Sequence, residues 1–242
     1  MIVNGYIFIT SSVLSFIISY LLIKYWNVLS IGGIDSCEGV QKIHVKGALR
    51  VGSIGLLIPF LFIGYIFNIF SEKIIQIIPF ILFIWTLGFI EDLTLSVSAK
   101  ARLIIMTIIT VLMIYFTEFS LFEVQSLFLT KFFSIKVIAI SFTLIGILAT
   151  MNSWNFIDGL NGLSSGLAIT SITTLSIICF KYNIDYYNFG LLLASSVLGF
   201  WALNIYSGRI FLGDSGSLSL GFTVSIFGII CVSTIPEISA WS

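Results

Sequence analysis

Long apolar stretches follow one another along almost the whole chain, separated by short polar segments. A bilayer core about 30 Å thick is crossed by about 20 apolar residues in a helix. The strands of a membrane β-barrel would instead alternate apolar and polar residues, which runs such as 54–69 and 103–115 do not do. The pattern therefore predicts an all-α integral membrane protein, one polytopic domain over residues 1–242 with about eight transmembrane helices. We place them at 2–23, 51–70, 74–90, 102–117, 135–153, 162–180, 188–206 and 218–235.

Composition agrees with a membrane protein and excludes several other classes. Hydrophobic residues make up 58% of the chain and charged residues 9%, which does not suit a water-soluble domain. Eleven Lys+Arg balance eleven Asp+Glu, so no basic surface for nucleic acid is expected. Cys37, Cys179 and Cys231 form no CxxC motif, and the single His44 excludes a histidine-rich zinc site. We expect the cysteines to be packing residues.

The basic residues predict the orientation, because Lys and Arg near membrane ends stay preferentially in the cytoplasm. Seven of them fall on one predicted side and four on the other. This bias predicts an exoplasmic N-terminus and an amphipathic exoplasmic segment over 118–134. The predicted cytoplasmic loops are 24–50, 91–101, 154–161 and 207–217.

Three of these cytoplasmic loops carry a carboxylate beside glycine or asparagine. Carboxylates at membrane ends are costly unless they are solvated or paired, so their gathering on one side indicates a functional site. The exoplasmic loops contain no comparable segment. The three motifs read GFIED (88–92), NSWNFIDGLNGL (152–163) and FLGDSGS (211–217).

Each motif also has a plainer interpretation. Glu91 and Asp92 could simply be an acidic helix end in water. They could also be a functional pair, in which one carboxylate accepts a proton while the other binds a cation. Asn155 and Asp158 are three residues apart, so on a continuing helix they would share one face, and here we favour a function. Asp214 opens a predicted helix whose N-terminus could hold phosphate oxygens together with Mg²⁺.

Glycines and basic residues beside the motifs favour structural interpretations when each is taken alone. Gly162 and Gly166 have the spacing of close helix packing, within one chain or between two chains of a homodimer. Lys46 and Arg50 belong to a basic cluster in the first cytoplasmic loop. The cluster fits the cytoplasmic bias of basic residues, and it could also attract a diphosphate or a lipid phosphate.

Together, in this order, the three motifs resemble those of the polyprenyl-phosphate N-acetylhexosamine-1-phosphate transferase family, glycosyltransferase family 4. The family motifs read about GFxDD, NxxNxxDGxDGL and FxGDxGS, and the chain has GFIEDL, NSWNFIDGLNGL and FLGDSGS. A looser match covers Lys42, His44, Gly52 and Gly55, so the resemblance spans about residues 40–221.

The resemblance implies transfer of a sugar-1-phosphate from a UDP-N-acetylhexosamine to polyprenyl phosphate, with release of UMP and the start of a lipid-linked cell-surface glycan. It implies a Mg²⁺ cofactor, with Mn²⁺ as the alternative, and an active site on the cytoplasmic face of a bacterial inner membrane. By motif position Asp214 would hold the metal, with Asp92 as a further candidate ligand. Glu91, Asp92 and Asp158 would be catalytic. The nucleotide-sugar would meet Lys46, Asn155, Asp158, Asn161, Asn204 and Phe211.

The chain departs from the family pattern in three places. Glu91 and Asn161 stand where the family has aspartates. The chain also ends at Ser242, before the histidine-rich loop and the last helices of the family. Two alternatives therefore remain at this stage: a shortened, catalytically impaired relative, and a secondary transporter with carboxylates along an ion path. The absence of an internal repeat and the position of the carboxylates at membrane ends disfavour the transporter.

Overall fold

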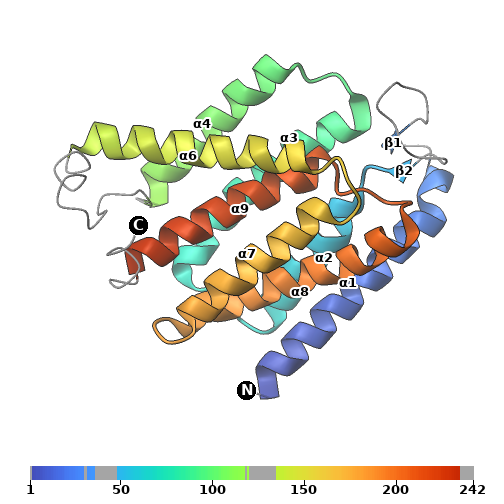
Figure 1. The fold of residues 1–242 in the computed structure, drawn as a ribbon, viewed down its shortest axis with the longest axis horizontal. Coiled ribbons are helices and arrows are strands. Elements are labelled where there is room, and N and C mark those ends of the chain that lie inside the picture. Colours follow the sequence, from blue (N-terminus) through green and yellow to red (C-terminus); the bar gives the residue numbers. More distant parts are fainter. Residues whose placement is uncertain (1, 30–31, 36–47, 118, 120–134, 235–242) are drawn as a thin grey trace.

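A computed structural model describes residues 2–29, 32–35, 48–117, 119 and 135–234. This part of the chain is an all-α bundle, as predicted, and it also contains a two-stranded antiparallel sheet that was not predicted (Figure 1). The elements are α1 (Ile2–Leu29), β1 (Ile34–Asp35), β2 (Ala48–Leu49), α2 (Gly52–Ile66), α3 (Glu72–Thr94), α4 (Ala99–Thr117), α6 (Lys136–Ile157), α7 (Leu163–Cys179), α8 (Ile184–Ser207) and α9 (Gly213–Thr234).

Six of the described helices are long and apolar enough to cross a membrane, namely α1, α3, α4, α6, α8 and α9. The other two, α2 and α7, are apolar but have only 15 and 17 residues. At a rise of 1.5 Å per residue, α2 is about 22 Å long. The prediction of a multi-pass membrane protein is confirmed.

Three helices reach further into the polar motifs than the apolar pattern predicted. The helix expected to end at residue 90 continues to Thr94, and the one expected to end at 153 continues to Ile157. The last helix begins at Gly213 instead of 218. Hydropathy indicates only the part of a helix that lies in the lipid. The backbone hydrogen bonds of a helix can continue beyond that part where its polar side chains have partners. The motif carboxylates Asp92 and Asp214 therefore lie on helices, not in loops.

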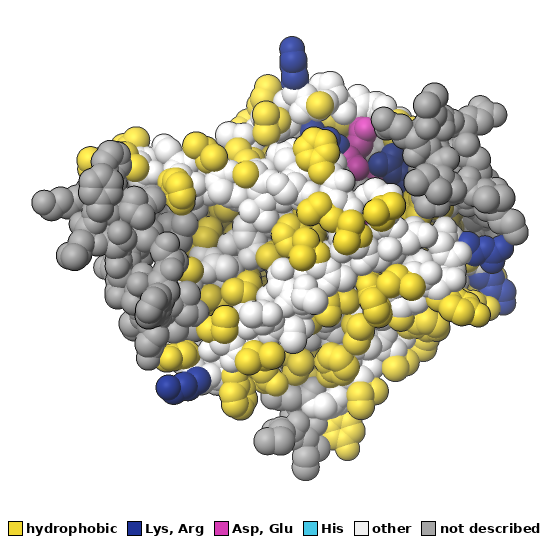
Figure 2. All heavy atoms as spheres, in the orientation of Figure 1, with side chains coloured by type: hydrophobic (Ala, Val, Ile, Leu, Met, Phe, Trp, Pro, Cys, Tyr) yellow, Lys and Arg dark blue, Asp and Glu magenta, His cyan; other side chains and the backbone are white. Residues whose placement is uncertain are grey.

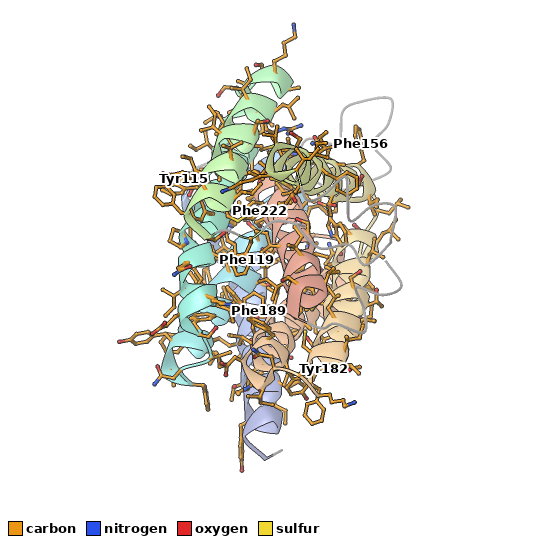
Figure 3. The ribbon with its side chains drawn as sticks, turned by 90° about the vertical axis from the view of Figure 1, so that its left-hand side faces the viewer. Tyr115, Phe119, Phe156, Tyr182, Phe189 and Phe222 are labelled. Atoms are coloured by element: carbon orange, nitrogen blue, oxygen red, sulfur yellow. The ribbon has the colours of Figure 1, made fainter. Side chains whose placement is uncertain are left out.

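The last helix, α9, forms the centre of the bundle. It packs against α3, α6, α7 and α2, and 83% of its membrane-spanning window is buried, against 22% for the outer helices α1 and α4. Its Phe222 is fully buried and Phe189 of α8 nearly so. Figure 3 shows both rings between the helices, whereas Tyr115 and Tyr182 point outward.

Small and polar residues allow close contacts between several helices. Ser11 of α1 hydrogen-bonds Ser196 of α8, with 2.6 Å between the hydroxyl oxygens. The Trp201 indole donates to the carbonyl of Gly162, and the same indole lies against Gly166, so both glycines serve packing here. Such contacts are typical of helix pairs in membranes. Cys179 and Cys231 are also buried, where α7 meets α9, while Cys37 lies outside the described residues.

The sheet holds the start of α9 in place at the end of the bundle drawn on the right in Figure 1. Strand β2 runs beside the connection between α8 and α9: the Leu49 N–H donates to the Arg209 carbonyl, and the Phe211 N–H donates to the Leu49 carbonyl. The Gly52 N–H then donates to the Phe211 carbonyl over 2.9 Å. These bonds bring Arg50 beside the first turn of α9. The predicted amphipathic segment over 118–134 lies, apart from Phe119, outside the described residues.

Candidate active site

The second and third motifs and two arginines meet at Asp214, in the first turn of α9. The Asn155 side-chain amide donates to Oδ1 of Asp214 over 3.1 Å and to the Ser217 hydroxyl over 2.9 Å. Arg50 donates from Nη2 to the same Oδ1 over 3.2 Å, and Nη1 of Arg102 pairs with Oδ2. Two guanidinium groups and one amide therefore surround this carboxylate, whose side chain is 12% exposed.

Asp92 lies beside this cluster but faces the backbone of α9. Its Oδ1 accepts the Asp214 N–H over 2.8 Å, and its Oδ2 accepts the Ser215 N–H over 2.9 Å and the Ser215 hydroxyl over 2.6 Å. Nε of Arg50 is 3.6 Å from Oδ1. The first N–H groups of a helix have no partner within it and carry partial positive charge. Asp92, which is 1% exposed, supplies both the acceptor and the negative charge.

The neighbouring Glu91 points elsewhere. Its Oε2 accepts the Val97 N–H over 2.7 Å and so holds the turn between α3 and α4. Successive residues on a helix are about 100° apart around its axis, so two adjacent carboxylates cannot both face α9. The predicted Glu91 and Asp92 pair therefore does not converge on one point.

A cavity of about 560 Å³ opens beside Asp214. Arg50 lines it as well, and Figure 2 shows a small acidic spot (magenta) between basic side chains (dark blue) on the visible face. Neither Glu91 nor Asp92 lines the cavity. Asp214, the expected metal ligand, lines it, and so do five of the residues expected to bind the nucleotide-sugar: Asn155, Asp158, Asn161, Asn204 and Phe211.

Asp158 follows the last residue of α6 and is the carboxylate whose protonation the surroundings alter most clearly. Burial raises the pKa of Asp158 well above its usual range, and the negative charges of Asp92 and Asp214 raise it further. The nearby positive charge of Arg50 acts in the opposite direction without cancelling the effect of burial. The folded chain therefore favours the protonated form of Asp158 more than water does for a solvated aspartate.

Not every expected site residue has a free polar group in the cavity. The side-chain amide of Asn204 donates to the Ile210 carbonyl over 2.6 Å and stabilises the turn before α9, and its side chain is almost fully buried. Lys46 lies outside the described residues. Arg102 was not expected at the site; it is one of the seven basic residues on the predicted cytoplasmic side. Carboxylates at a membrane end require cations nearby, and Arg102 follows the GFIED motif by ten residues on the same predicted side.

Asp214 is the cavity carboxylate with the chemistry of a Mg²⁺ ligand, but its oxygens are paired with Arg50, Arg102 and Asn155 in this structure. This ion prefers oxygen ligands and is commonly held by one or two carboxylates together with substrate phosphates. Within the described residues no cluster of three or more Asp, Glu, His or Cys could hold a metal by itself. Asp214 instead offers one carboxylate on the wall of a cavity large enough for a phosphorylated substrate.

The fold and site define a polytopic membrane protein with a cavity at one end of its helix bundle. Carboxylate and amide groups line this cavity, and two arginines pair with one of the carboxylates, Asp214. The model of glycosyl transferase family 4 matches residues 74–232, a range that holds all three motifs. The chain belongs to this family, as its motifs predicted.

Curated relatives agree with this membership. The chain is 28% identical over 211 residues to a probable undecaprenyl-phosphate N-acetylglucosaminyl 1-phosphate transferase of Bacillus subtilis, covering 84% of this chain and 56% of that relative. It is 26% identical over 239 residues to the phospho-N-acetylmuramoyl-pentapeptide-transferase of Acetivibrio thermocellus, and this match covers 93% of this chain and 72% of that relative. For the same enzyme of Wolbachia pipientis wMel the identity is 28% over 245 residues, covering 95% and 75%. The chain thus spans little more than half of the Bacillus relative.

Proposed function

We propose that this chain transfers an N-acetylhexosamine-1-phosphate, or a related sugar-1-phosphate, from a UDP-sugar to polyprenyl phosphate and releases UMP. The observation that carries the proposal is the convergence of Arg50, Arg102 and Asn155 on Asp214 at the wall of the cavity. Two guanidinium groups beside one carboxylate suit a diphosphate, whose oxygens they can bind in pairs. The names of the curated relatives support the same substrate classes.

The reaction would be a direct displacement. An oxygen of the polyprenyl phosphate attacks the β-phosphorus of the UDP-sugar, the bond from that phosphorus to the bridging oxygen breaks, and UMP leaves with the bond's electron pair. Mg²⁺ on Asp214 would neutralise negative charge on the diphosphate and on the departing UMP. Mn²⁺ is the alternative ion.

The protein's own groups would position the diphosphate. Arg50 and Arg102, paired with Asp214 in the present structure, would turn toward the phosphate oxygens when the nucleotide-sugar enters. Asn155 would keep Asp214 oriented, since its amide bridges that carboxylate and Ser217. Protonated Asp158 would donate a hydrogen bond to a phosphate or sugar oxygen.

Asn161 and Phe211 line the same cavity and would meet the nucleotide, the ring of Phe211 by stacking on the base. The proposed orientation puts this end of the bundle in the cytoplasm of a bacterium, where UDP-sugars are made. A transporter site would lie near the middle of the membrane between repeats. The cavity is at one end of the helices instead, which favours the transferase.

Release of UMP tests the proposal. Membranes containing the chain would be incubated with undecaprenyl phosphate, Mg²⁺ and a panel of UDP-N-acetylhexosamines. Asp214→Asn should abolish the release, whereas Asp185→Asn, at the opposite end of α8, should keep it. Equal turnover by Asp214→Asn and the unmutated chain would refute the assignment, and the panel would identify the sugar.

A further inference from the structure

The carboxylate of Asp92 is fully engaged by groups of this chain. Its two oxygens accept three hydrogen bonds from Asp214 and Ser215, and Arg50 lies 3.6 Å away. The residue is 1% exposed and does not line the cavity. A carboxylate that binds a metal or accepts a proton from substrate needs a lone pair directed at it. The oxygens of Asp92 are directed at the backbone of α9.

The rest of the GFIED motif serves the same contact. Gly88 lies one helical turn before Asp92, on the same face of α3. A Cβ atom at Gly88 would lie 2.5 Å from both Cα and N of Ser215, so only glycine lets α9 approach so closely. Gly88 and Asp92 together form a seat for the first turn of α9.

Two further contacts fix α9 on this seat. The hydroxyl of Ser53, from α2, lies 2.6 Å from the hydroxyl of Ser215, which itself donates to Asp92. Gly213 has φ +77°, and a Cβ atom there would lie 2.5 Å from Oδ2 of Asp92. The turn before α9 therefore needs a glycine both for its backbone angle and for its distance from Asp92.

We infer that Asp92 is a positioning residue, which docks the N-terminus of α9 on α3 and thereby sets the place of Asp214 in the cavity. This assignment rests on the proposed function for its effect on turnover, but the docking itself does not. It departs from the role that the family resemblance implied, in which Asp92 lies near the attacking lipid phosphate or binds the metal.

Hydrogen exchange tests the docking without any reaction. Asp92→Asn replaces one acceptor by an amide that cannot accept the Ser215 N–H, so the amides of residues 214 and 215 should exchange at least about tenfold faster. Ser215→Ala is the milder variant and should give a smaller increase. Ser219→Ala is the matched control, because Ser219 lies one turn further along α9 and its hydroxyl bonds only α9 carbonyls in the described structure. Unchanged exchange in Asp92→Asn would overturn the inference.

Turnover then separates positioning from direct contact with substrate. If Asp92 acts through α9, Asp92→Asn should lower kcat, leave KM for the lipid phosphate within about twofold, and keep the shape of the pH profile. Ser215→Ala should add nothing to the loss in Asp92→Asn, because its hydroxyl acts on the same contact. Loss of one limb of the pH profile, or additive losses, would instead assign Asp92 to the reacting atoms. Should the unmutated chain release no UMP, the proposed function fails, and the exchange result still decides the docking.

Discussion

Replacing Gly88 by alanine would measure how closely the site depends on the docking of α9. The added Cβ would lie 2.5 Å from Cα and N of Ser215 and 2.6 Å from the carbonyl carbon of Asp214, whereas ordinary contacts begin at 3.4 Å. These are backbone atoms, so α9 must move by about 0.9 Å. Overpacking of this kind costs about 1–3 kcal/mol. A displacement near 1 Å at a reacting centre lowers turnover by about 100-fold.

Gly146→Ala provides the control for this change. Gly146 also lies within a membrane helix, α6, but a Cβ atom there would have no neighbour within 4 Å. The control should therefore be neutral, or more stable by up to about 1 kcal/mol from helix propensity. Thermal unfolding in detergent and UMP release would be measured for both variants. If Gly88→Ala had the same Tm as the unmutated chain and a turnover within twofold of it, the close docking would be refuted.

Three further predictions follow from the structure. Arg102→Gln should raise the affinity of the free protein for Mn²⁺ by about 2- to 5-fold, because a partly exposed ion pair with Asp214 contributes about 0.5–1 kcal/mol; electron paramagnetic resonance titration measures this, and an unchanged affinity would contradict it. Asp158→Asn should raise the Tm at neutral pH and lose this gain in acid. The pKa of Asp158 is raised on folding, so the stability of the unmutated chain falls as the pH rises from the unfolded-state pKa toward the folded-state pKa, and asparagine removes this loss. A gain in Tm that is independent of pH would be evidence against this. Mild oxidation should join Cys179 to Cys231, whose sulfur atoms are 2.9 Å apart, in a cross-link found by mass spectrometry; preferential cross-linking to Cys37 would contradict the packing of α7 on α9.

The sequence predicted the helical class and the family, because both depend on patterns that a single chain displays. Apolar runs of membrane length leave few alternatives to helices, and three ordered motifs identify a family more specifically than any one of them. It also predicted that the three motifs lie on one side of the membrane, and in the structure Asn155 of the second motif hydrogen-bonds Asp214 of the third. Since helices alternate in direction across a membrane, motifs on the same side are brought to the same end of the bundle.

The direction of each side chain could not be predicted in the same way. Glu91 and Asp92 were expected to act as a pair because they are adjacent in the sequence and match the carboxylate pair of the family motif. Once α3 continues to Thr94, the helical rotation sends Glu91 toward Val97 and Asp92 toward α9. Arg102 was missed for a related reason, since its contact with Asp214 joins residues 112 positions apart and depends on how α4 packs against α3 and α6. Local patterns contain no information on such a contact.

Three of the carboxylates at this end of the bundle, Asp92, Asp158 and Asp214, have different surroundings at the membrane boundary. Charge there must be paired or removed. Asp92 is paired with the N-terminus of α9, and Asp214 with Arg50 and Arg102. The pKa of Asp158 is instead raised, because the effect of burial exceeds that of the nearby positive charge of Arg50. In the proposed reaction only Asp214 would exchange its partners, giving up arginines that then bind phosphate. The carboxylate that can hold a metal is thus the one whose present partners are mobile side chains, whereas Asp92 is held by backbone groups that cannot leave.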